Sequence, residues 1–200
     1  VLSNKPEYQE SWAKAIINLG VILTRRIEGD KATNQEEAIK LYKQSSKILT
    51  KKGFSNEWAV NQHNLAKAYL FRINGKKSEN IEEAIKYCEN VLSVLTRQSN
   101  PEEWGKAIHT MGMVYFQRLQ GDPIANREKA LDYYNQALNV FNQENDSQRW
   151  AEIQVNLAAV YIERKSSDLQ KNLLDAISCC EQALLVYTKD RYPCLLYTSD

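Results

Sequence analysis

Histidine and cysteine are the side chains of this sequence best suited to bind a metal ion or to act as a nucleophile. His63 and His109 lie 46 residues apart, and the same step reaches Ile17 on one side and Val155 on the other. A zinc site takes about four ligands, and no cysteine or carboxylate shares this spacing. We therefore predict no metal site.

Two of the four cysteines, Cys88 and Cys180, are related by the same step to Tyr42 and Tyr134. We interpret both thiols as replacements of buried aromatic side chains, which makes them unreactive. A Cys-His protease would also need an oxyanion pocket, and the chain has only seven glycines to build one. We predict a non-catalytic chain that needs no cofactor.

The step of 46 residues runs through the whole sequence and indicates four tandem units. Tryptophan, arginine, asparagine and alanine each recur at this step without a gap. The four sets are Trp12, Trp58, Trp104 and Trp150; Arg26, Arg72, Arg118 and Arg164; Asn34, Asn80, Asn126 and Asn172; and Ala38, Ala84, Ala130 and Ala176.

Each unit is predicted to form two antiparallel helices. In the first unit, residues 12–30 carry apolar side chains at helical spacing, with Gly29 where a left-handed C-terminal cap is needed. Asn34, followed by Glu37, is typical of an N-cap, so we expect the second helix over residues 36–49. Stacked hairpins share one core that a single hairpin cannot form. The sequence therefore predicts an all-α solenoid of antiparallel helix pairs with four repeats.

The recurring arginines end the first helix of each unit, where a positive charge is favourable for the helix dipole. We expect them to pair with Asp30, Asp122 or Asp168. A structural role explains four copies better than ligand binding does.

The units resemble the tetratricopeptide repeat. The signature includes Leu-Gly type pairs in the first helix and Ala followed by Tyr in the second, and it is found at Leu19-Gly20, Leu65-Ala66, Met111-Gly112, Leu157-Ala158, Ala38 with Tyr42, and Ala130 with Tyr134. The resemblance covers residues 5–193 and implies a right-handed superhelical solenoid that binds proteins. The 46-residue variant is similar to the arms of bacterial, notably cyanobacterial, proteins that carry a CHAT domain, a caspase-like peptidase.

The resemblance also implies a concave groove lined by the first helix of each unit. We expect this groove to bind a peptide or protein segment through a mixture of polar and apolar side chains. The candidate residues are Lys14, Asn18, Val60, His63, Asn64, Lys67, Phe71, Lys106, His109, Met113, Gln117 and Asn156. The family's carboxylate clamp is matched only at Asn64 and Lys106, so we do not expect a receptor for chaperone tails.

The repeat domain is predicted to comprise units at about residues 5–50, 51–96, 97–142 and 143–188 within residues 5–193. Residues 194–200, CLLYTSD, break the repeat, and we interpret them as a tail of non-native sequence. The chain begins with Val1 rather than Met, and neither end has the polar cap usual for a solenoid. We therefore interpret the sequence as a fragment.

The charge and apolar patterns favour neither nucleic acid nor a membrane as a partner. Twenty-six basic and 25 acidic residues give a net charge of +1, so no global field attracts nucleic acid or anionic lipid. No apolar run approaches the roughly 20 residues that span a bilayer, and no signal-peptide core is present. We expect a cytoplasmic protein.

Three functions are compatible with these patterns. The leading hypothesis is a non-catalytic protein-protein interaction scaffold. The alternative is the sensor arm of a larger CHAT-type peptidase whose catalytic domain lies outside this fragment. A nucleic-acid-binding solenoid would require Lys14, Lys67 and Lys106 to form a continuous basic ridge.

Overall fold

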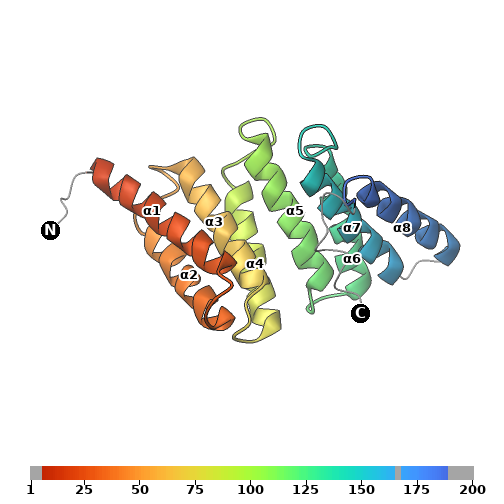
Figure 1. Cartoon of the computed structure of the whole chain (residues 1–200), viewed down its shortest axis with the longest axis horizontal. Coiled ribbons are helices and arrows are strands. Elements are labelled where there is room, and N and C mark those ends of the chain that lie inside the picture. Colours follow the sequence, from red (N-terminus) through yellow and green to blue (C-terminus); the bar gives the residue numbers. More distant parts are fainter. Residues whose placement is uncertain (1–5, 165–167, 189–200) are drawn as a thin grey trace. The chain divides into compact units, whose positions relative to one another are not determined.

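The computed structural model describes residues 6–164 and 168–188, and these residues form eight helices and no strand (Figure 1). The helices are α1 (Pro6–Arg25), α2 (Lys31–Ser45), α3 (Ser55–Leu70), α4 (Lys77–Leu92), α5 (Pro101–Gln117), α6 (Pro123–Leu138), α7 (Ser147–Glu163) and α8 (Leu169–Leu184). The predicted all-α array of helix pairs is confirmed. The tail interpreted as non-native, residues 194–200, lies outside the described residues.

The chain divides into two compact units, Val1–Thr110 and Met111–Asp200, and α5 contains the boundary. In the first unit, α1 packs on α2 and α3 packs on α4, while α3 also contacts both α1 and α2. In the second unit, α7 contacts α6 and α8. Within each unit, these successive helices are therefore neighbours, as expected for stacked hairpins.

The turn inside each hairpin differs in detail from the prediction. Gly29 has a φ of +83°, which confirms the left-handed glycine, but α1 already ends at Arg25. The cap of α2 is Asp30, whose carboxylate accepts a hydrogen bond from Thr33 N at 2.6 Å. The predicted N-cap, Asn34, lies inside the helix, so α2 begins one turn earlier than expected.

The four recurring asparagines instead hold the hairpin turn closed. Asn34 Nδ2 donates to the carbonyl of Glu28 at 3.0 Å, and Asn80 Nδ2 donates to that of Asn74 at 2.8 Å. All four asparagines are buried. Because a buried amide needs partners, the repeat retains asparagine here to satisfy the carbonyls of a sharp turn.

Glycine in the first helix of a hairpin allows the second helix to approach closely. A Cβ built on Gly20 would lie 2.5 Å from Cε1 of Tyr42, a ring that is almost fully buried. Gly112 meets Tyr134 in the same way. In the other two units, the repeat register pairs an alanine with a cysteine, Ala66 with Cys88 and Ala158 with Cys180. A larger residue on one helix is thus matched by a smaller one on its neighbour.

The two cysteines in this register have different environments. Cys88 is fully buried, and burial raises the pKa of its thiol, as expected for an unreactive core residue. Cys180 is exposed on α8, so its predicted burial is wrong. The reason is that no helix covers that side of α8 in the described structure.

Arginines at the ends of the first helices link consecutive hairpins. Arg72 Nε and Nη2 donate to Glu36 at 2.7 and 2.8 Å, and Arg164 binds Glu128 with the same two nitrogens at 2.7 and 2.8 Å. The expected pairing with an aspartate of the turn is therefore wrong at these two positions. The aspartates cap helices, whereas the arginines form bidentate ion pairs with the preceding unit.

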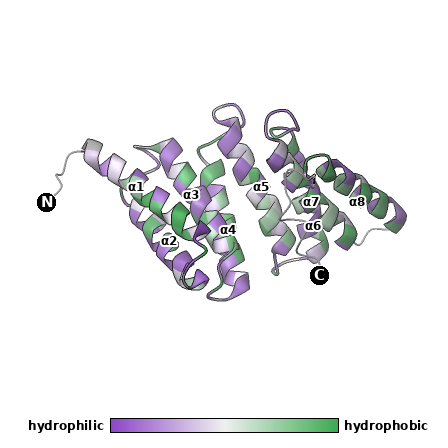
Figure 2. Ribbon diagram, viewed as in Figure 1, coloured by the Kyte–Doolittle hydropathy of each residue, from purple (hydrophilic) through white to green (hydrophobic). Residues whose placement is uncertain are grey.

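Apolar packing between hairpins is also visible in the first unit. Ala59, Val91, Leu95 and Ala107 form a buried cluster, and Trp58 is half-buried against it. Figure 2 shows hydrophobic residues recurring along the helices rather than gathering in one segment. Trp58 and Trp104 thus belong to the packing of neighbouring hairpins.

Candidate partner-binding cleft

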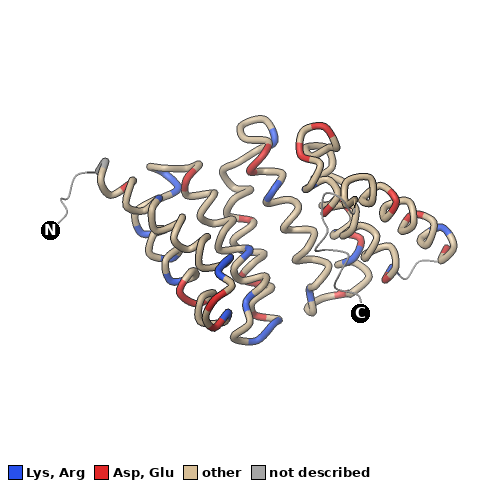
Figure 3. Tube along the Cα trace, in the orientation of Figure 1, with Lys and Arg blue, Asp and Glu red and all other residues tan. Residues whose placement is uncertain are grey.

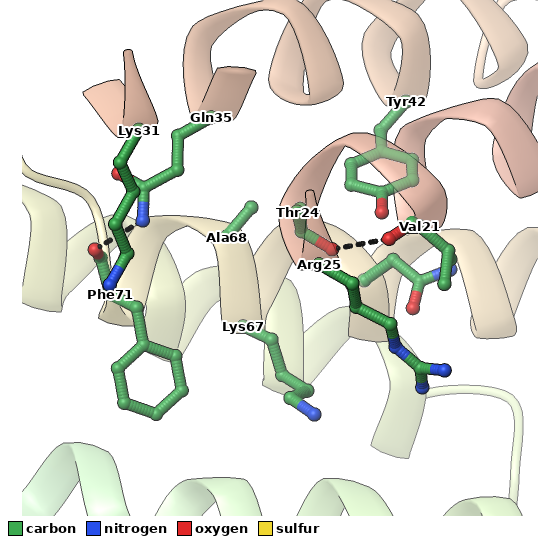
Figure 4. Close-up of a pocket in the computed structure, with 10 residues that line it drawn as sticks. Val21, Thr24, Arg25, Lys31, Gln35, Tyr42, Lys67, Ala68 and Phe71 are labelled. Atoms are coloured by element: carbon green, nitrogen blue, oxygen red, sulfur yellow. Dashed lines mark hydrogen bonds between the residues drawn. The ribbon is translucent and has the colours of Figure 1, made fainter. Parts of the chain in front are cut away.

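A cleft of about 410 Å³ opens among α1, α2 and α3 in the first unit (Figure 4). It is lined by Val21, Thr24 and Arg25 of α1, Lys31, Gln35 and Tyr42 of α2, and Asn64, Lys67, Ala68 and Phe71 at the end of α3. A cleft of this size lies within the usual range of ligand pockets.

Gln35 fixes one wall of the cleft. Its Nε2 donates to the carbonyl of Phe71 at 2.9 Å, and its Oε1 accepts from the backbone N of Ile73 at 3.1 Å. Gln35 is buried, so both bonds are shielded from water and hold the end of α3 against α2. The Phe71 ring is 48% exposed beside this fixed backbone. The cleft therefore offers an apolar surface on a preorganised frame.

Tyr42 lies in the interior of the cleft, with only 2% of its surface exposed. Burial raises the pKa of Tyr42 to about 12, although a hydrogen bond with Thr24 acts in the opposite direction. The phenol is neutral at pH 7. It contributes hydrogen-bonding capacity to the cleft without adding charge.

The charged side chains of the cleft are all basic. Arg25, Lys31 and Lys67 line it, and no aspartate or glutamate does. Arg25 and Lys31 form no ion pair with any residue in the described part of the chain. The residues that line the cleft therefore carry formal charge of one sign only, which is positive.

A second, smaller cleft of about 240 Å³ lies between α1 and α3. Lys14, Ile17, Asn18, Asn56, Glu57 and Val60 line it. Lys14 Nζ contacts Glu10 at 2.6 Å and Glu57 at 3.1 Å, and the hydrogen bonds to these carboxylates raise the pKa of Lys14. This cleft already contains both signs of charge, so it has less capacity for a charged ligand.

The predicted groove residues of the first unit are divided between these two clefts and the interior. Asn64, Lys67 and Phe71 line the larger cleft, whereas Lys14, Asn18 and Val60 line the smaller one. Lys106 lies outside both. Burial acts to lower the pKa of Lys106, but its hydrogen bonds to Glu102 and Glu103 outweigh burial and raise it.

The two histidines are buried where the prediction expected a groove surface. His63 and His109 are 8% and 5% exposed. His63 Nε2 lies 3.0 Å from Thr110 Oγ1, so the imidazole has a partner inside the unit. In the described part of the chain, no three His, Cys, Asp or Glu side chains gather as a metal site would require.

The remaining predicted residues belong to the second unit. Met113 and Gln117 lie on α5, and Asn156 lies on α7. All three are half-buried. Their role in partner binding stays a prediction.

The sequence analysis did not predict that Arg25, Lys31 and Gln35 line the larger cleft. The predicted groove contained only residues of the first helix of each unit, whereas Lys31 and Gln35 belong to the start of the second helix. The repeat gives no signal for Gln35, because the equivalent positions hold Ile81, Arg127 and Leu173. Only the packing of α2 against α3 reveals its position.

Comparison with known proteins identifies the family to which this chain belongs. The sequence model described as soluble NSF attachment protein, SNAP, matches residues 30–183, which is more than half of the chain. The chain belongs to the SNAP family. No curated protein and no solved structure matches it.

Membership of the SNAP family agrees with a tetratricopeptide-like helical repeat and with a protein-interaction adaptor. The matched region includes the α2 and α3 walls of the larger cleft, and α1 precedes it. None of the described helices combines the length and apolar character needed to cross a membrane.

Proposed function

We propose that this SNAP-family chain is a non-catalytic scaffold that binds an acidic segment of a partner protein in the cleft formed by α1, α2 and α3. The observation that carries the proposal is the combination of Arg25, Lys31 and Lys67 without a lining carboxylate. Carboxylates of a partner would form charge-assisted hydrogen bonds there, which are stronger than neutral ones.

Phe71 supports a protein segment rather than a small anion. Its exposed ring lies at the same edge of the cleft as Lys31 and Lys67 in Figure 4. Partially exposed aromatic side chains beside cations are typical of interface centres. The family is named for attachment of NSF, so an NSF-type protein is one candidate partner. We place this interaction in the cytoplasm.

The test begins with a display library of random peptides selected against the full chain. Selected peptides should be enriched in Asp and Glu. Charge reversal by Arg25→Glu together with Lys31→Glu should weaken their binding, because it removes two cations that would bind the carboxylates of the peptide. We expect a loss of at least about tenfold in affinity, which corresponds to about 1.4 kcal/mol. The matched control is Lys52→Glu, an exposed lysine that lines neither cleft.

Two outcomes would contradict this proposal. One is a selected set of peptides without acidic residues. The other is equal affinity for the wild type and the doubly reversed variant when both have the same far-UV circular dichroism spectrum and melting temperature.

A second candidate function is the sensor arm of a larger caspase-like peptidase. Its support is the 46-residue repeat phrase, which resembles the arms of CHAT-domain proteins. In that case, a partner in the cleft would control a catalytic domain elsewhere in the protein. Reading the source gene beyond the codon for Asp200 tests this: a domain with catalytic His and Cys would support it, and a different domain or a stop codon would contradict it.

Nucleic acid is a less favoured partner. Lys14 and Lys106 are both held by glutamates, so they do not form a basic ridge with Lys67. Figure 3 shows basic and acidic residues interspersed along the helices. A mixed distribution of charged residues along the chain is unlike the basic stripe that binds phosphates.

A further inference from the structure

One side of α1 carries a stripe of exposed apolar side chains. Tyr8, Trp12, Leu19 and Ile22 follow one another at steps of four, seven and three residues, which places them on one face of the helix. Their exposed fractions are 51, 42, 48 and 62%. This is a large apolar surface for a single helix, and such surfaces usually mark an interaction site.

The same stripe is buried in the other first helices. The counterparts of Leu19 and Ile22 are Leu65 and Ala68 in α3, and Leu157 and Val160 in α7, all of them buried. Asn61, on this stripe of α3, donates to the carbonyl of Tyr42 in α2 at 2.8 Å. The stripe is therefore the surface with which a first helix packs on the second helix of the preceding unit.

A complementary apolar face is exposed on α8. Leu173, Ile177 and Leu184 are spaced by four and seven residues and are 44, 54 and 60% exposed. Cys180 lies between them on the same face and is also exposed. Figure 2 shows hydrophobic residues along α8 as well as along α1.

In the other second helices, the equivalent face is covered. Ile177 corresponds to Ile39 in α2 and to Leu131 in α6, both of them buried. Helix α2 contacts the following helix α3, and α6 contacts the following helix α7. The exposed face of α8 is thus the surface that receives the next first helix.

The polar residues found at the α2–α3 junction are replaced by leucines on α8. Gln35 and Glu36 bind the end of α3, and their counterparts are Leu173 and Leu174. The exposed faces of α1 and α8 are thus both apolar, and by the repeat register they are of matching types.

We propose that copies of this chain associate head to tail, with the α1 stripe of one copy packed on the α8 face of the next. The junction has the register of the internal junctions, so Leu19 faces the region of Ile177 and Cys180. Burial of apolar surface drives the association. The contact joins two different faces, so it is heterologous and each added copy leaves one face of each type available.

In the proposed junction between copies, the repeat register places Leu174 opposite an arginine. Arg26 is the counterpart of Arg72, and Leu174 is the counterpart of Glu36. At the junction between copies, Arg26 of one chain would therefore meet Leu174 of the other without a carboxylate. Leu174→Glu should create the missing ion pair and strengthen association, whereas adding Arg26→Glu to it should remove the gain.

Sedimentation velocity of the full chain tests the proposal. The wild type should form dimers and larger species as its concentration rises to about 100 μM, a range that detects moderate affinities. Leu19→Asp removes the α1 face and Ile177→Asp removes the α8 face, so each variant alone should stay monomeric. An equimolar mixture of the two should form a dimer and nothing larger, because only one intact junction remains.

Controls separate loss of the interface from loss of the fold. Ile124→Asp changes an exposed isoleucine in the first turn of α6, outside both faces, and should associate as the wild type does. Trp12→Glu and Leu173→Glu serve as second variants of the two faces if either aspartate variant has a lowered melting temperature.

The outcomes are distinguishable from those of peptide binding, because no peptide is present. A wild type that stays monomeric at about 100 μM would overturn the proposal. Self-association of Leu19→Asp or Ile177→Asp to the extent of the wild type would also overturn it, since a heterologous contact needs both faces.

Discussion

Gly20 of α1 lies in close contact with the Tyr42 ring of α2, and the next unit offers a comparison for this contact. A Cβ at position 20 would lie 2.5 Å from a ring carbon of Tyr42. In the next unit, alanine at position 66 coincides with cysteine at position 88. The residue type on one helix therefore depends on the size of the side chain that faces it.

Gly20→Ala should destabilise the protein by up to about 2 kcal/mol, because overpacking costs about 1–3 kcal/mol and the gain in helix propensity offsets about 1 kcal/mol. In a Tyr42→Cys background, which reproduces the Ala66 and Cys88 combination, the same substitution should cost nothing or stabilise. Urea unfolding of the two single variants and the double variant measures the coupling. An equal cost of Gly20→Ala in both backgrounds would show that the ring does not limit the approach.

The prediction that Cys88 and Cys180 are both buried is right for the first residue and wrong for the second. The buried position of Cys88 followed from its alignment with Tyr42 and is confirmed. Cys180 has the same alignment but is exposed, because alignment describes a position within a unit and not whether another unit covers it. The same limit applies to His63, which was placed at the groove surface and is buried beside Thr110.

Helices are joined by ion pairs that recur with the repeat. Arg72 contacts Glu36 through two nitrogens, and hydrogen bonds from this guanidinium hold the pKa of Glu36 below its usual range. The two side chains are 25 and 35% exposed, so water and salt screen the pair. We therefore expect a modest contribution to the free energy of unfolding.

Glu36→Gln should lower the free energy of unfolding at pH 7 by about 0.5–1 kcal/mol. A carboxyl with a lowered folded-state pKa stabilises the protein above the unfolded pKa of about 4.5 and loses this effect as pH falls through the folded pKa. The difference between Glu36→Gln and the wild type should therefore shrink below about pH 4.5. Chemical denaturation from pH 7 to pH 3 measures it.

Glu37 provides the control for this experiment. It is an exposed carboxylate on the same helix and forms no ion pair with the described residues. Glu37→Gln should leave the pH dependence of unfolding as in the wild type. A difference for Glu36→Gln that stays constant down to pH 3 would contradict the ion pair.

The helices could be predicted from the sequence, but the residues at which they begin and end could not. The 46-residue step and the apolar spacing were sufficient to identify paired helices. The start of α2 was misplaced because Asn34 has the chemistry of an N-cap, and so does Asp30 four residues earlier. Asn34 is used instead to bind the Glu28 carbonyl, a contact between turn and helix that local sequence rules do not describe.

At the scale of the whole molecule, the prediction of a protein-binding surface depended on the family resemblance, and the structure places only some of the predicted residues in the larger cleft. Asn64, Lys67 and Phe71 were anticipated and line the larger cleft. The basic residues Arg25 and Lys31 were missed because they flank the turn between α1 and α2 and follow no repeated pattern. Packing of three helices brings these side chains together, and only the folded chain shows that the described residues lining the cleft include no carboxylate.

The central claim is that this cleft of the first unit holds the partner. Its most direct test is photo-crosslinking from a benzophenone side chain placed at Phe71, with an acidic peptide selected against the full chain. The control position is Leu119, which is exposed in the turn between α5 and α6. We predict crosslinking from position 71 that excess unlabelled peptide suppresses, and none from position 119. Equal crosslinking from both positions, or crosslinking from position 119 alone, would contradict the claim.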